Sequence, residues 1–439
     1  MKNYRINPGG SLIGNLKVDG DKSISHRAIM FGALAEGTTR VRDILEGEDV
    51  KATISAFRKM GILIEHVEGD YLVHGNGLHG LRQPKAALDM GNSGTAFRLL
   101  AGILCGQQWS SAIFGDASLN NRPMGRIINP LRQMGAVIES DNDKPPLMVH
   151  PSSGLRGIRY ELPVASAQVK SAILLAGLYA KGETAVKESA PSRDHTERML
   201  NGFGYQVNRD GSWVSLRGGG GLSASQIEVP ADLSSATFFI LGALISAGSD
   251  LLLSRVGVNP SRSGILPILE RMGANVERTN ETDVGGEPVA DLRVRSSRLV
   301  ATKIDANDVA LAVDEIPAIA VAAARADGVT EIRGAEELRV KESDRISSTV
   351  TGLRNLGINV EEHSDGMTIT GGRFQSGEVQ SEGDHRIAMA FSMAANVASG
   401  PVCIADIDCV ATSFPNFYQL ARQTGLDVEV VSAKSTDES

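Results

Sequence analysis

The sequence predicts an α/β fold in which one helix–strand–helix–strand–strand unit is repeated six times. Two series of glycines carry this prediction, because each glycine closes a helical segment and the two series alternate strictly. In addition, the first helix of each unit is apolar on nearly every side, which is typical of a helix buried all round. The first series is Gly37, Gly106, Gly182, Gly248, Gly328 and Gly400, and the second is Gly61, Gly135, Gly204, Gly273, Gly357 and Gly425.

The fifth copy shows the elements in order. Residues 314–328 predict a helix with an acidic start, Pro317 in its first turn and an alanine-rich interior. A short strand and a polar loop follow, and residues 344–357 then predict an amphipathic helix. Residues 358–372 predict two strands joined by a turn at Asp365-Gly366. Buried first helices, outer second helices and strands packed around them satisfy this pattern.

Length and composition limit the classes of protein to which the chain can belong. A chain of 439 residues is too long for one compact core, so we expect two domains with three repeats each. The net charge of −8 argues against nucleic acid as the main partner. No apolar stretch reaches the ~18 residues of a membrane span, and the first residues lack a secretory apolar core. We therefore expect a cytoplasmic protein without a membrane partner.

The three cysteines show no metal-binding spacing. Cys105, Cys403 and Cys409 lie among apolar neighbours, so we expect all three to be small buried hydrophobic residues in a reducing compartment. The sequence also lacks a His/Cys cluster of the kind that holds zinc. We predict no metal site.

Polar residues gather where each first helix begins. Capping explains a Ser, Asp or Asn there, and for any single one it is as good an explanation as ligand binding. It does not explain Lys22, Gln168 or Arg386, because a cation beside the positive end of a helix is unfavourable unless an anion lies between them. If these starts converge in each domain, two facing domains would enclose an anion-binding cleft. The starts are Lys22-Ser23, Asn92-Ser93-Gly94-Thr95, Ser166-Ala167-Gln168, Ser234-Ser235, Asp314-Glu315 and Asp384-His385-Arg386.

Arginine recurs in the loop between the strand and the second helix of the unit. A single exposed arginine is usually just solvated, but repetition on the side of the helix starts favours ligand binding for Arg122, Arg193 and Arg345. A guanidinium binds carboxylate or phosphate through two parallel hydrogen bonds. We interpret Arg262 as structural. The densest charge run, residues 339–345, also brings Lys341 and Glu342 beside Arg345.

Eight segments of the chain match the motifs of one known family. They are GDKSISHRA at 20–28, GNSGTAFRLL at 91–100, NNRPMG at 120–125, ASAQVKSAILLAG at 165–177, SRDHTERML at 192–200, DEIP at 314–317, LRVKESDR at 338–345 and GDHRIAMA at 383–390. These segments resemble the 5-enolpyruvylshikimate-3-phosphate synthases, in the second sequence class of that family. The resemblance implies a two-domain inverse α/β barrel of the enolpyruvyl transferase type, with three units per domain. One domain would be residues 21–231 and the other residues 1–20 plus 232–439, with the active site in the cleft between them.

The resemblance also implies a reaction of addition followed by elimination. The 5-hydroxyl of shikimate 3-phosphate attacks C2 of phosphoenolpyruvate while C3 is protonated, and the tetrahedral adduct then loses phosphate and a C3 proton. This is a step of the shikimate pathway, toward chorismate and the aromatic amino acids. It implies a monomer without metal or organic cofactor, acting on two small anions.

Residue roles carry over position by position. Asp314 resembles the base at the hydroxyl, Glu342 resembles the acid at C3, and Lys22 is expected to contact both substrates. Phosphoenolpyruvate would be held by Arg122, Arg345, Arg386, Gly94 and Thr95. Shikimate 3-phosphate would be held by Ser23, Arg27, Ser166, Gln168, Arg193, Asp314 and Lys341. Asn92 and Ala167 complete the predicted substrate-binding set.

The chain departs from the first sequence class at two places. Thr412 and Ser413 stand where that class has a lysine before Phe-Pro, so its basic contact to the leaving phosphate has no counterpart here. Ala167 replaces a serine and removes one hydroxyl contact. Gly94 keeps the smaller residue at a position where some second-class members carry alanine, and glyphosate is therefore expected to compete with phosphoenolpyruvate.

Two other readings of the sequence remain. The enolpyruvyl transferase acting on UDP-N-acetylglucosamine shares the fold, but the loop at 116–125 lacks that family's cysteine and Lys22 is followed by Ser23 rather than asparagine. A repeat scaffold that binds partners without catalysis would need no acid–base pair, and Asp314 and Glu342 would then be solvated charges.

Overall fold

The computed structural model describes residues 2–432, and its internal contacts divide the chain into two compact units. The first, here called the N-terminal unit, contains residues 20–230 together with Asp283–Glu287. The second, the C-terminal unit, contains the other described residues. The short segment 283–287 is the tip of a hairpin whose strands belong mainly to the C-terminal unit, an excursion that the sequence analysis did not anticipate.

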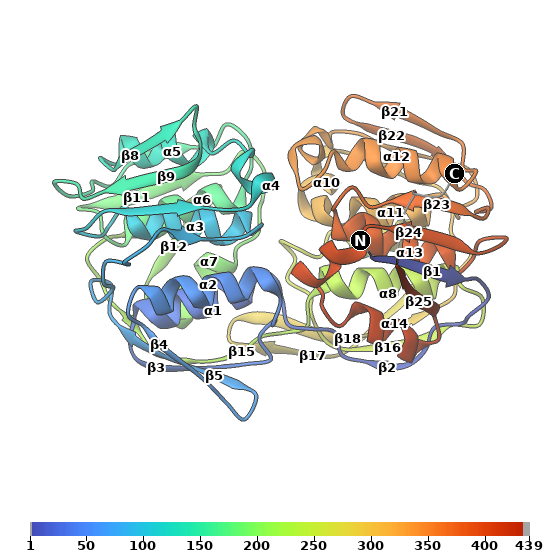
Figure 1. Cartoon of the computed structure of the whole chain (residues 1–439), viewed down its shortest axis with the longest axis horizontal. Coiled ribbons are helices and arrows are strands. Elements are labelled where there is room, and N and C mark those ends of the chain that lie inside the picture. The colour runs from blue at the N-terminus through green and yellow to red at the C-terminus, as the bar shows by residue number, and fades with distance from the viewer. Residues whose placement is uncertain (1, 433–439) are drawn as a thin grey trace. The chain divides into compact units, whose positions relative to one another are not determined.

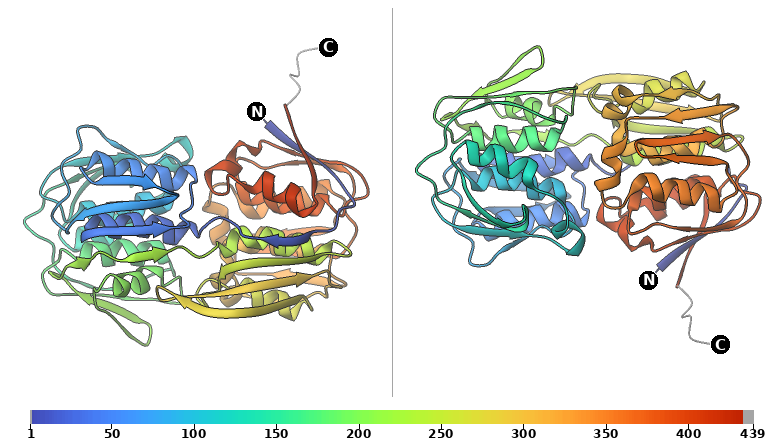
Figure 2. Two further views of the ribbon diagram at one scale, coloured as in Figure 1. Left: turned by 90° about the horizontal axis from the view of Figure 1, so that it is seen from below. Right: turned by 90° about the horizontal axis from the view of Figure 1, so that it is seen from above.

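Three buried helices form the centre of the N-terminal unit. Helix α3 packs against both α6 and α1, and the three run alongside one another in Figures 1 and 2. Nearly every residue of α1 is buried, as expected for a helix that is apolar on all sides. The inner helices are α1 (Lys22–Leu34), α3 (Gly94–Leu104) and α6 (Ala167–Gly177); the others are α2 (Glu48–Lys59), α4 (Ala117–Asn120), α5 (Gly125–Gln133) and α7 (His195–Gly202).

Three small sheets accompany these helices, one for each repeat. In each, the first strand of the repeat lies between a parallel neighbour and an antiparallel hairpin. The sheet orders are β14-β3-β5-β4 with β15 also on β3, β6-β7-β9-β8, and β10-β11-β13-β12. The strands are β3 (Ala35–Arg42), β4 (Leu63–Val67), β5 (Asp70–Asn76), β6 (Leu88–Asp89), β7 (Ser111–Phe114), β8 (Val137–Asp141), β9 (Lys144–His150), β10 (Arg159–Glu161), β11 (Glu183–Lys187), β12 (Val207–Asp210), β13 (Trp213–Arg217), β14 (Leu222–Ser223) and β15 (Gln226–Glu228).

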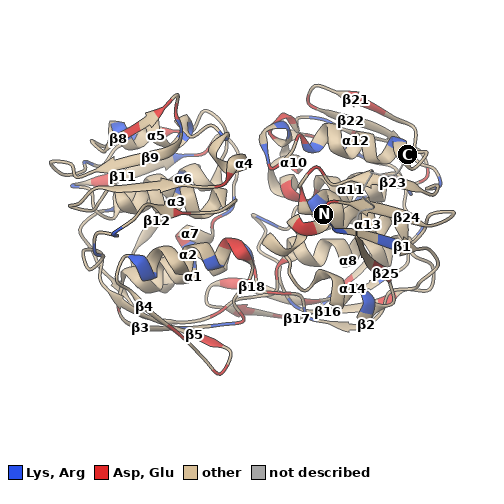
Figure 3. Cartoon of the chain, in the orientation of Figure 1, with Lys and Arg blue, Asp and Glu red and all other residues tan. Residues whose placement is uncertain are grey.

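The C-terminal unit repeats the plan. Its inner helices α8, α11 and α13 pack against one another in all three pairs. Helices α8 and α11 carry no charged residue at all (Figure 3). The helices are α8 (Leu233–Ile245), α9 (Ile265–Arg271), α10 (Ala306–Ala312), α11 (Ile316–Ala323), α12 (Arg345–Asn355), α13 (His385–Ala395) and α14 (Phe417–Thr424), with 3₁₀ turns η1 (Val313–Glu315), η2 (Glu336–Val340) and η3 (Ile407–Thr412).

The sheets of this unit follow the same order. They read β2-β16-β18-β17, β19-β20-β22-β21 and β23-β24-β1-β25. In the last of these, strand β1 from the start of the chain takes the place of one hairpin strand, between β24 and β25. The strands are β1 (Lys2–Asn7), β2 (Ile13–Leu16), β16 (Asp250–Gly257), β17 (Asn275–Val284), β18 (Glu287–Arg295), β19 (Lys303–Ile304), β20 (Val329–Ile332), β21 (Val360–His363), β22 (Gly366–Thr370), β23 (Gly377–Gln380), β24 (Val402–Ala405) and β25 (Asp427–Ser432).

The predicted α/β repeat is confirmed, with two local corrections. All six glycines of the second series have positive φ, such as 111° at Gly425 where α14 ends, a conformation that glycine adopts without steric cost. In the first series, Gly106 directly follows Cys105 at the C-cap of α3, as predicted, but the other five glycines lie three to five residues beyond the last residue of their helices. Helix α1 stops at Leu34 and Gly37 already lies in β3. Among the cysteines, Cys105 is buried as predicted, but Cys403 in β24 and Cys409 in η3 are only partly buried.

Within residues 2–432, no helix combines the length and the apolar character that crossing a membrane requires.

Candidate functional site

Arg345 is the centre of a buried charged cluster in the C-terminal unit. Its side chain is 1% exposed and donates from Nε to Asp384 (2.7 Å), from Nη1 to Asp314 (3.1 Å) and from Nη2 to Glu342 (2.5 Å). Burial alone lowers the pKa of this guanidinium, but Asp384, Glu342 and Asp314 outweigh burial and hold the pKa above its ordinary value. One permanent cation therefore joins three carboxylates from separate elements of the fold.

Arg386, in the first turn of α13, extends this cluster. Its Nη1 donates to the backbone oxygen of Asp314 (3.0 Å) and lies 3.7 Å from Glu315 Oε1, while Nη2 lies 3.9 Å from Asp314 Oδ2. Glu315 in turn accepts a hydrogen bond from Ser234 Oγ in α8. The starts of all three inner helices of this unit are thus linked through side chains at one place.

In the charge run at 339–345, some side chains lie near the surface and the Arg345 side chain is buried. Arg339 makes ion pairs with Asp344 (2.7 Å) and Glu362 (3.0 Å) near the surface. Lys341 Nζ lies 3.2 Å from Glu337 Oε1 and the lysine side chain is 23% exposed, so this ion pair lies outside the Arg345 cluster. Asp344 also caps α12, which fixes the point from which Arg345 turns inward.

Arg27 is a buried cation of the N-terminal unit. It donates to Thr196 Oγ1 (2.7 Å), to the backbone oxygen of Ser23 (2.9 Å) and to Ser171 Oγ (3.0 Å). Burial lowers its pKa to about 10, with Arg193 acting in the same direction, although Glu197 and nearby carboxylates oppose the shift. Arg27 is therefore still a cation at neutral pH and is aligned by three neutral oxygens.

Lys22, the first residue of α1, lies near the surface of the same unit. Its Nζ is 3.0 Å from Asp49 Oδ2, and the two side chains are 18% and 10% exposed. Asp21 caps the helix through the backbone N–H of Ile24, so Lys22 itself plays no capping role.

A second network joins the starts of α3 and α6. Arg98 donates to Gln168 Oε1 (2.9 Å) and to the backbone oxygen of Gly94 (3.1 Å), and Gln168 donates to Thr95 Oγ1 (2.8 Å). Arg98 was not predicted as a site residue. The sequence feature that could have indicated it is a lone charge one turn after Gly94 in an otherwise apolar helix.

Arg122 approaches the same helix start from its loop. Its Nη2 donates to Asn92 Oδ1 (2.6 Å), and the residue is 9% exposed. A Cβ added to Gly94 would lie 2.6 Å from Arg98 Nη1 and 3.2 Å from Arg122 Nη1. The absence of a side chain at Gly94 therefore lets two guanidinium groups approach the amino end of α3.

The remaining predicted residues occupy the expected helix start and loop. Ser166 caps α6 by accepting from the N–H of Val169, and Ala167 is the first helical residue. Arg193 is partly buried and immediately precedes the first turn of α7. Arg262, interpreted as structural, donates to Asp232 (3.0 Å) and Ser234 (2.9 Å) at the start of α8.

The predicted site residues thus form two sets, one in each unit. The C-terminal set is Asp314, Lys341, Glu342, Arg345 and Arg386. The N-terminal set is Lys22, Ser23, Arg27, Asn92, Gly94, Thr95, Arg122, Ser166, Ala167, Gln168 and Arg193. The partners that orient these groups were not predicted, chiefly Asp49, Thr196 and Arg98, and Asp384 was predicted only as part of a helix start. Among the described residues, no three His, Cys, Asp or Glu side chains are arranged to hold a metal ion.

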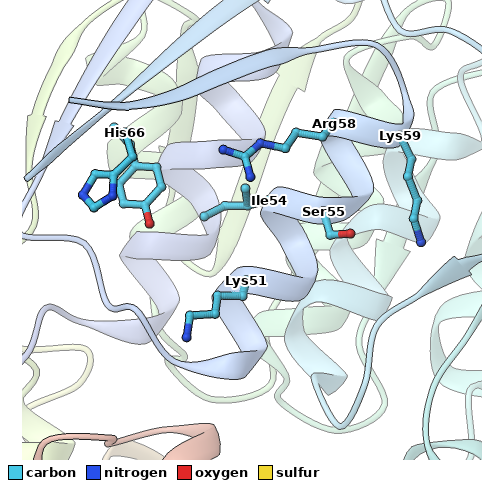
Figure 4. A pocket seen from close by; sticks show the side chains of 7 residues that line it. Lys51, Ile54, Ser55, Arg58, Lys59 and His66 are labelled. Atoms are coloured by element: carbon cyan, nitrogen blue, oxygen red, sulfur yellow. The ribbon is translucent and has the colours of Figure 1, made fainter.

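One cavity lies apart from both sets. It has a volume of about 700 Å³ and is formed by the outer face of α2 and the β4–β5 hairpin (Figure 4). None of the predicted site residues lines it. The lining residues are Lys51, Ile54, Ser55, Arg58, Lys59, His66 and Tyr71.

Comparison with solved structures identifies the fold of the chain. It superposes on the enolpyruvyl transferase NikO of Streptomyces tendae with a TM-score of 0.81 at 16% identity, covering 98% and 99% of the two chains, a likeness of fold alone. It superposes on EPSP synthase from Acinetobacter baumannii with a TM-score of 0.89 at 50% identity, covering 98% and 100%. The fold is therefore the two-domain inverse α/β barrel of the enolpyruvyl transferases.

Sequence comparison identifies the family. The model of EPSP synthase (3-phosphoshikimate 1-carboxyvinyltransferase) matches residues 6–420. The 3-phosphoshikimate 1-carboxyvinyltransferase of Acidithiobacillus ferrooxidans is 58% identical over 434 residues, 99% of this chain and 100% of that relative. The chain belongs to the EPSP synthase family, and the resemblance drawn from its motifs is confirmed.

Proposed function

We propose that Asp314 and Glu342 are the acid–base pair with which this chain transfers the enolpyruvyl group of phosphoenolpyruvate to the 5-hydroxyl of shikimate 3-phosphate. The transfer itself follows from family membership over almost the whole chain, so the UDP-N-acetylglucosamine and non-catalytic readings are set aside. The chain is a transferase of the shikimate pathway. The residue roles are the part that we propose.

The observation that supports the pair is its shared partner. Arg345 donates to both Asp314 and Glu342, so the two carboxyl groups lie beside the same guanidinium and can act on neighbouring reacting atoms of the substrates. The reaction needs a base at the attacking hydroxyl and an acid at C3 of phosphoenolpyruvate in the same step. In the second step the C2–O bond to phosphate breaks and C3 returns its proton. Glu342 donates a proton to C3 in the first step and accepts a C3 proton in the second. Asp314 accepts the proton of the attacking hydroxyl.

Cationic groups supply the electrostatic part of the proposal. Arg345 and Arg386 from the C-terminal unit and Lys22 and Arg122 from the N-terminal unit bind the carboxylate and phosphate of phosphoenolpyruvate. The N–H groups at the start of α3, at Gly94 and Thr95, add the positive end of a helix. Removal of one such preorganised contact is expected to cost about 3 kcal/mol in the transition state.

Shikimate 3-phosphate is assigned mainly to the N-terminal set. Arg27 and Arg193 provide positive charge, and Ser23, Ser166 and Gln168 provide neutral hydrogen bonds; Lys341 and Asp314 contribute from the other unit. The proposal therefore requires residues of both units to reach the same two substrates. It extends to glyphosate as a competitor of phosphoenolpyruvate, because Gly94 carries no side chain beside Arg98 and Arg122, and to a monomeric cytoplasmic enzyme.

The test measures phosphate release from phosphoenolpyruvate with shikimate 3-phosphate, with UDP-N-acetylglucosamine and with no acceptor. Asp314→Asn and Glu342→Gln should each lower kcat by roughly 10²–10⁴-fold. In D2O, Glu342→Gln should also lose incorporation of deuterium at C3. Glu361→Gln removes an exposed carboxyl from β21 and should leave turnover unchanged. Near-normal turnover of either site variant would remove that residue from its role.

A further inference from the structure

The hairpin formed by β17 and β18 reaches the N-terminal unit with its tip. Residues Asp283–Glu287 group with that unit by their contacts, whereas most of both strands belongs to the C-terminal unit. Arg198 of α7 donates to the backbone oxygen of Gly286 (2.7 Å), and His195 of α7 bonds Glu287 through Nδ1 (2.8 Å). The tip is therefore hydrogen-bonded to α7 near its start, at His195 and Arg198.

The His195–Glu287 pair is deeply buried. The two side chains are 2% and 5% exposed. Among the described residues, the second ring nitrogen of His195, Nε2, is buried without a hydrogen-bond partner. The orientation of the imidazole therefore depends on Glu287, and removal of that carboxylate would leave both ring nitrogens buried and unsatisfied.

Thr196 and Glu197, which follow His195, connect the start of α7 to the inner helices α1 and α6. Thr196 accepts the Nε–H of Arg27 (2.7 Å) and bonds Ser171 Oγ (2.7 Å). Glu197 lies 2.7 Å from the fully buried Nζ of Lys170. Three consecutive side chains, of His195, Thr196 and Glu197, thus hold this turn, and one of their contacts is made by the hairpin tip.

The same turn carries two groups assigned to shikimate 3-phosphate. Arg193 lies in the loop two residues before His195, and Arg27 is aligned by Thr196, one residue after it. A shift of the first turn of α7 would therefore move both guanidinium groups together. Misplacement of a substrate-binding group by about 1 Å is enough to change binding and rate strongly.

We propose that Glu287 is a positioning residue for shikimate 3-phosphate binding: through His195 it holds the first turn of α7, and so sets the places of Arg193 and Arg27. The inference rests on the proposed function, since it takes these two arginines as contacts of that substrate. It assigns a role in the N-terminal binding set to a residue that the sequence places in the middle of the other unit.

The first experiment compares Glu287→Ala, Glu287→Gln and the control Glu281→Gln, which alters an exposed carboxyl on the same hairpin. Isothermal titration should show shikimate 3-phosphate binding weakened roughly tenfold in Glu287→Ala, less in Glu287→Gln because an acceptor oxygen remains, and unchanged in the control. The KM for phosphoenolpyruvate at saturating shikimate 3-phosphate should stay near that of the parent. A purely structural role would instead lower the midpoint of unfolding and leave the affinity of the folded protein unchanged, which would overturn the proposal.

A double-mutant cycle tests whether Glu287 acts through His195. His195→Ala should weaken binding about as much as Glu287→Ala, and the double variant should be no worse than either, because both remove one contact. His195→Asn keeps a donor near the position of Nδ1 and should recover part of the affinity. Additive losses would contradict the proposal. Failure of the parent protein to release phosphate would instead count against the proposed function, so the two failures are distinguishable.

Discussion

Asp384 uses its two carboxylate oxygens for different purposes, capping α13 with one and accepting the Nε–H of Arg345 with the other. Oδ1 accepts from the N–H of Arg386 (2.9 Å) and Oδ2 accepts from Arg345 (2.7 Å). Asp384 and the Arg345 side chain are both essentially inaccessible to water. The buried guanidinium that joins Asp314 and Glu342 is thus tied directly to the amino end of an inner helix.

Asp384→Asn should therefore destabilise the protein and impair turnover. The amide keeps the cap but leaves Arg345 without one buried counter-charge, a change that costs about 3–5 kcal/mol. Urea unfolding and phosphate release measure the two effects. Ser343→Ala removes only a neutral donor to the same oxygen (3.2 Å) and should cost about 1 kcal/mol. Equal losses in the two variants would show that the charge of Asp384 is unimportant.

Gly94→Ala should weaken the binding of phosphoenolpyruvate without unfolding the protein. The new methyl would displace Arg98 and Arg122, the ends of two flexible side chains, while alanine favours the helix. We expect KM for phosphoenolpyruvate to rise about fivefold or more, corresponding to the ~1–3 kcal/mol of a tight small-to-large change. Gly372→Ala is the matched control, since its Cβ would meet nothing closer than 3.4 Å. An unchanged KM would remove Gly94 from the substrate site.

His26 should make the stability of the protein depend on pH below neutrality. Burial, with Lys22 and Arg27 nearby, holds the pKa of His26 well below its ordinary value of 6.5. Below pH 6.5 the unfolded chain binds a proton that the folded protein does not, so stability falls as pH falls, by up to about 1.4 kcal/mol per unit. Urea unfolding at several pH values should show a shallower slope for His26→Gln, and the parent slope for a substitution of the exposed His79. Identical slopes for the parent and His26→Gln would refute this assignment.

Lys170→Met should destabilise the N-terminal unit strongly. Lys170 Nζ lies 3.0 Å from Glu188 and 2.7 Å from Glu197, with its side chain fully buried. Its removal leaves these carboxylates with the half-exposed Arg209, 2.8 Å from Glu188 and 3.9 Å from Glu197, and should cost about 3–5 kcal/mol. The triple variant with Glu188→Gln and Glu197→Gln should recover part of this loss. Lys187→Met breaks a solvent-exposed pair with Glu161 and should cost under about 1 kcal/mol. Chemical denaturation compares all three, and a mild effect of Lys170→Met would mean that Arg209 or water compensates the charge of the carboxylates.

The repeat pattern allowed the fold and most helix starts to be predicted from the sequence. Helix α1 begins at Lys22 and α13 at His385, within a residue of the positions that the polar clusters indicated. These features are local, because capping residues, apolar periodicity and closing glycines all act over a few positions. The resemblance to the family then selected the candidate site residues.

The partners that orient these residues could not be predicted in this way. Asp49 lies on α2 but bonds Lys22 on α1, and Glu287 bonds His195 although 92 positions separate them. Such contacts depend on how distant repeats pack, and nothing in the periodicity of either segment encodes them. Arg98 is the exception that a closer reading could have found, because a cation in a buried helix needs a buried partner.

The place of β1 in the last sheet has a consequence for how the chain is made. Strand β1 is synthesised before its two neighbours, β24 and β25, which lie in the final repeat. During synthesis this strand stays unpaired until both neighbours have been translated, with its backbone groups open to wrong partners. The sixth sheet can therefore close only after β25 has been made, and the C-terminal unit acquires its complete set of sheets later than the N-terminal unit.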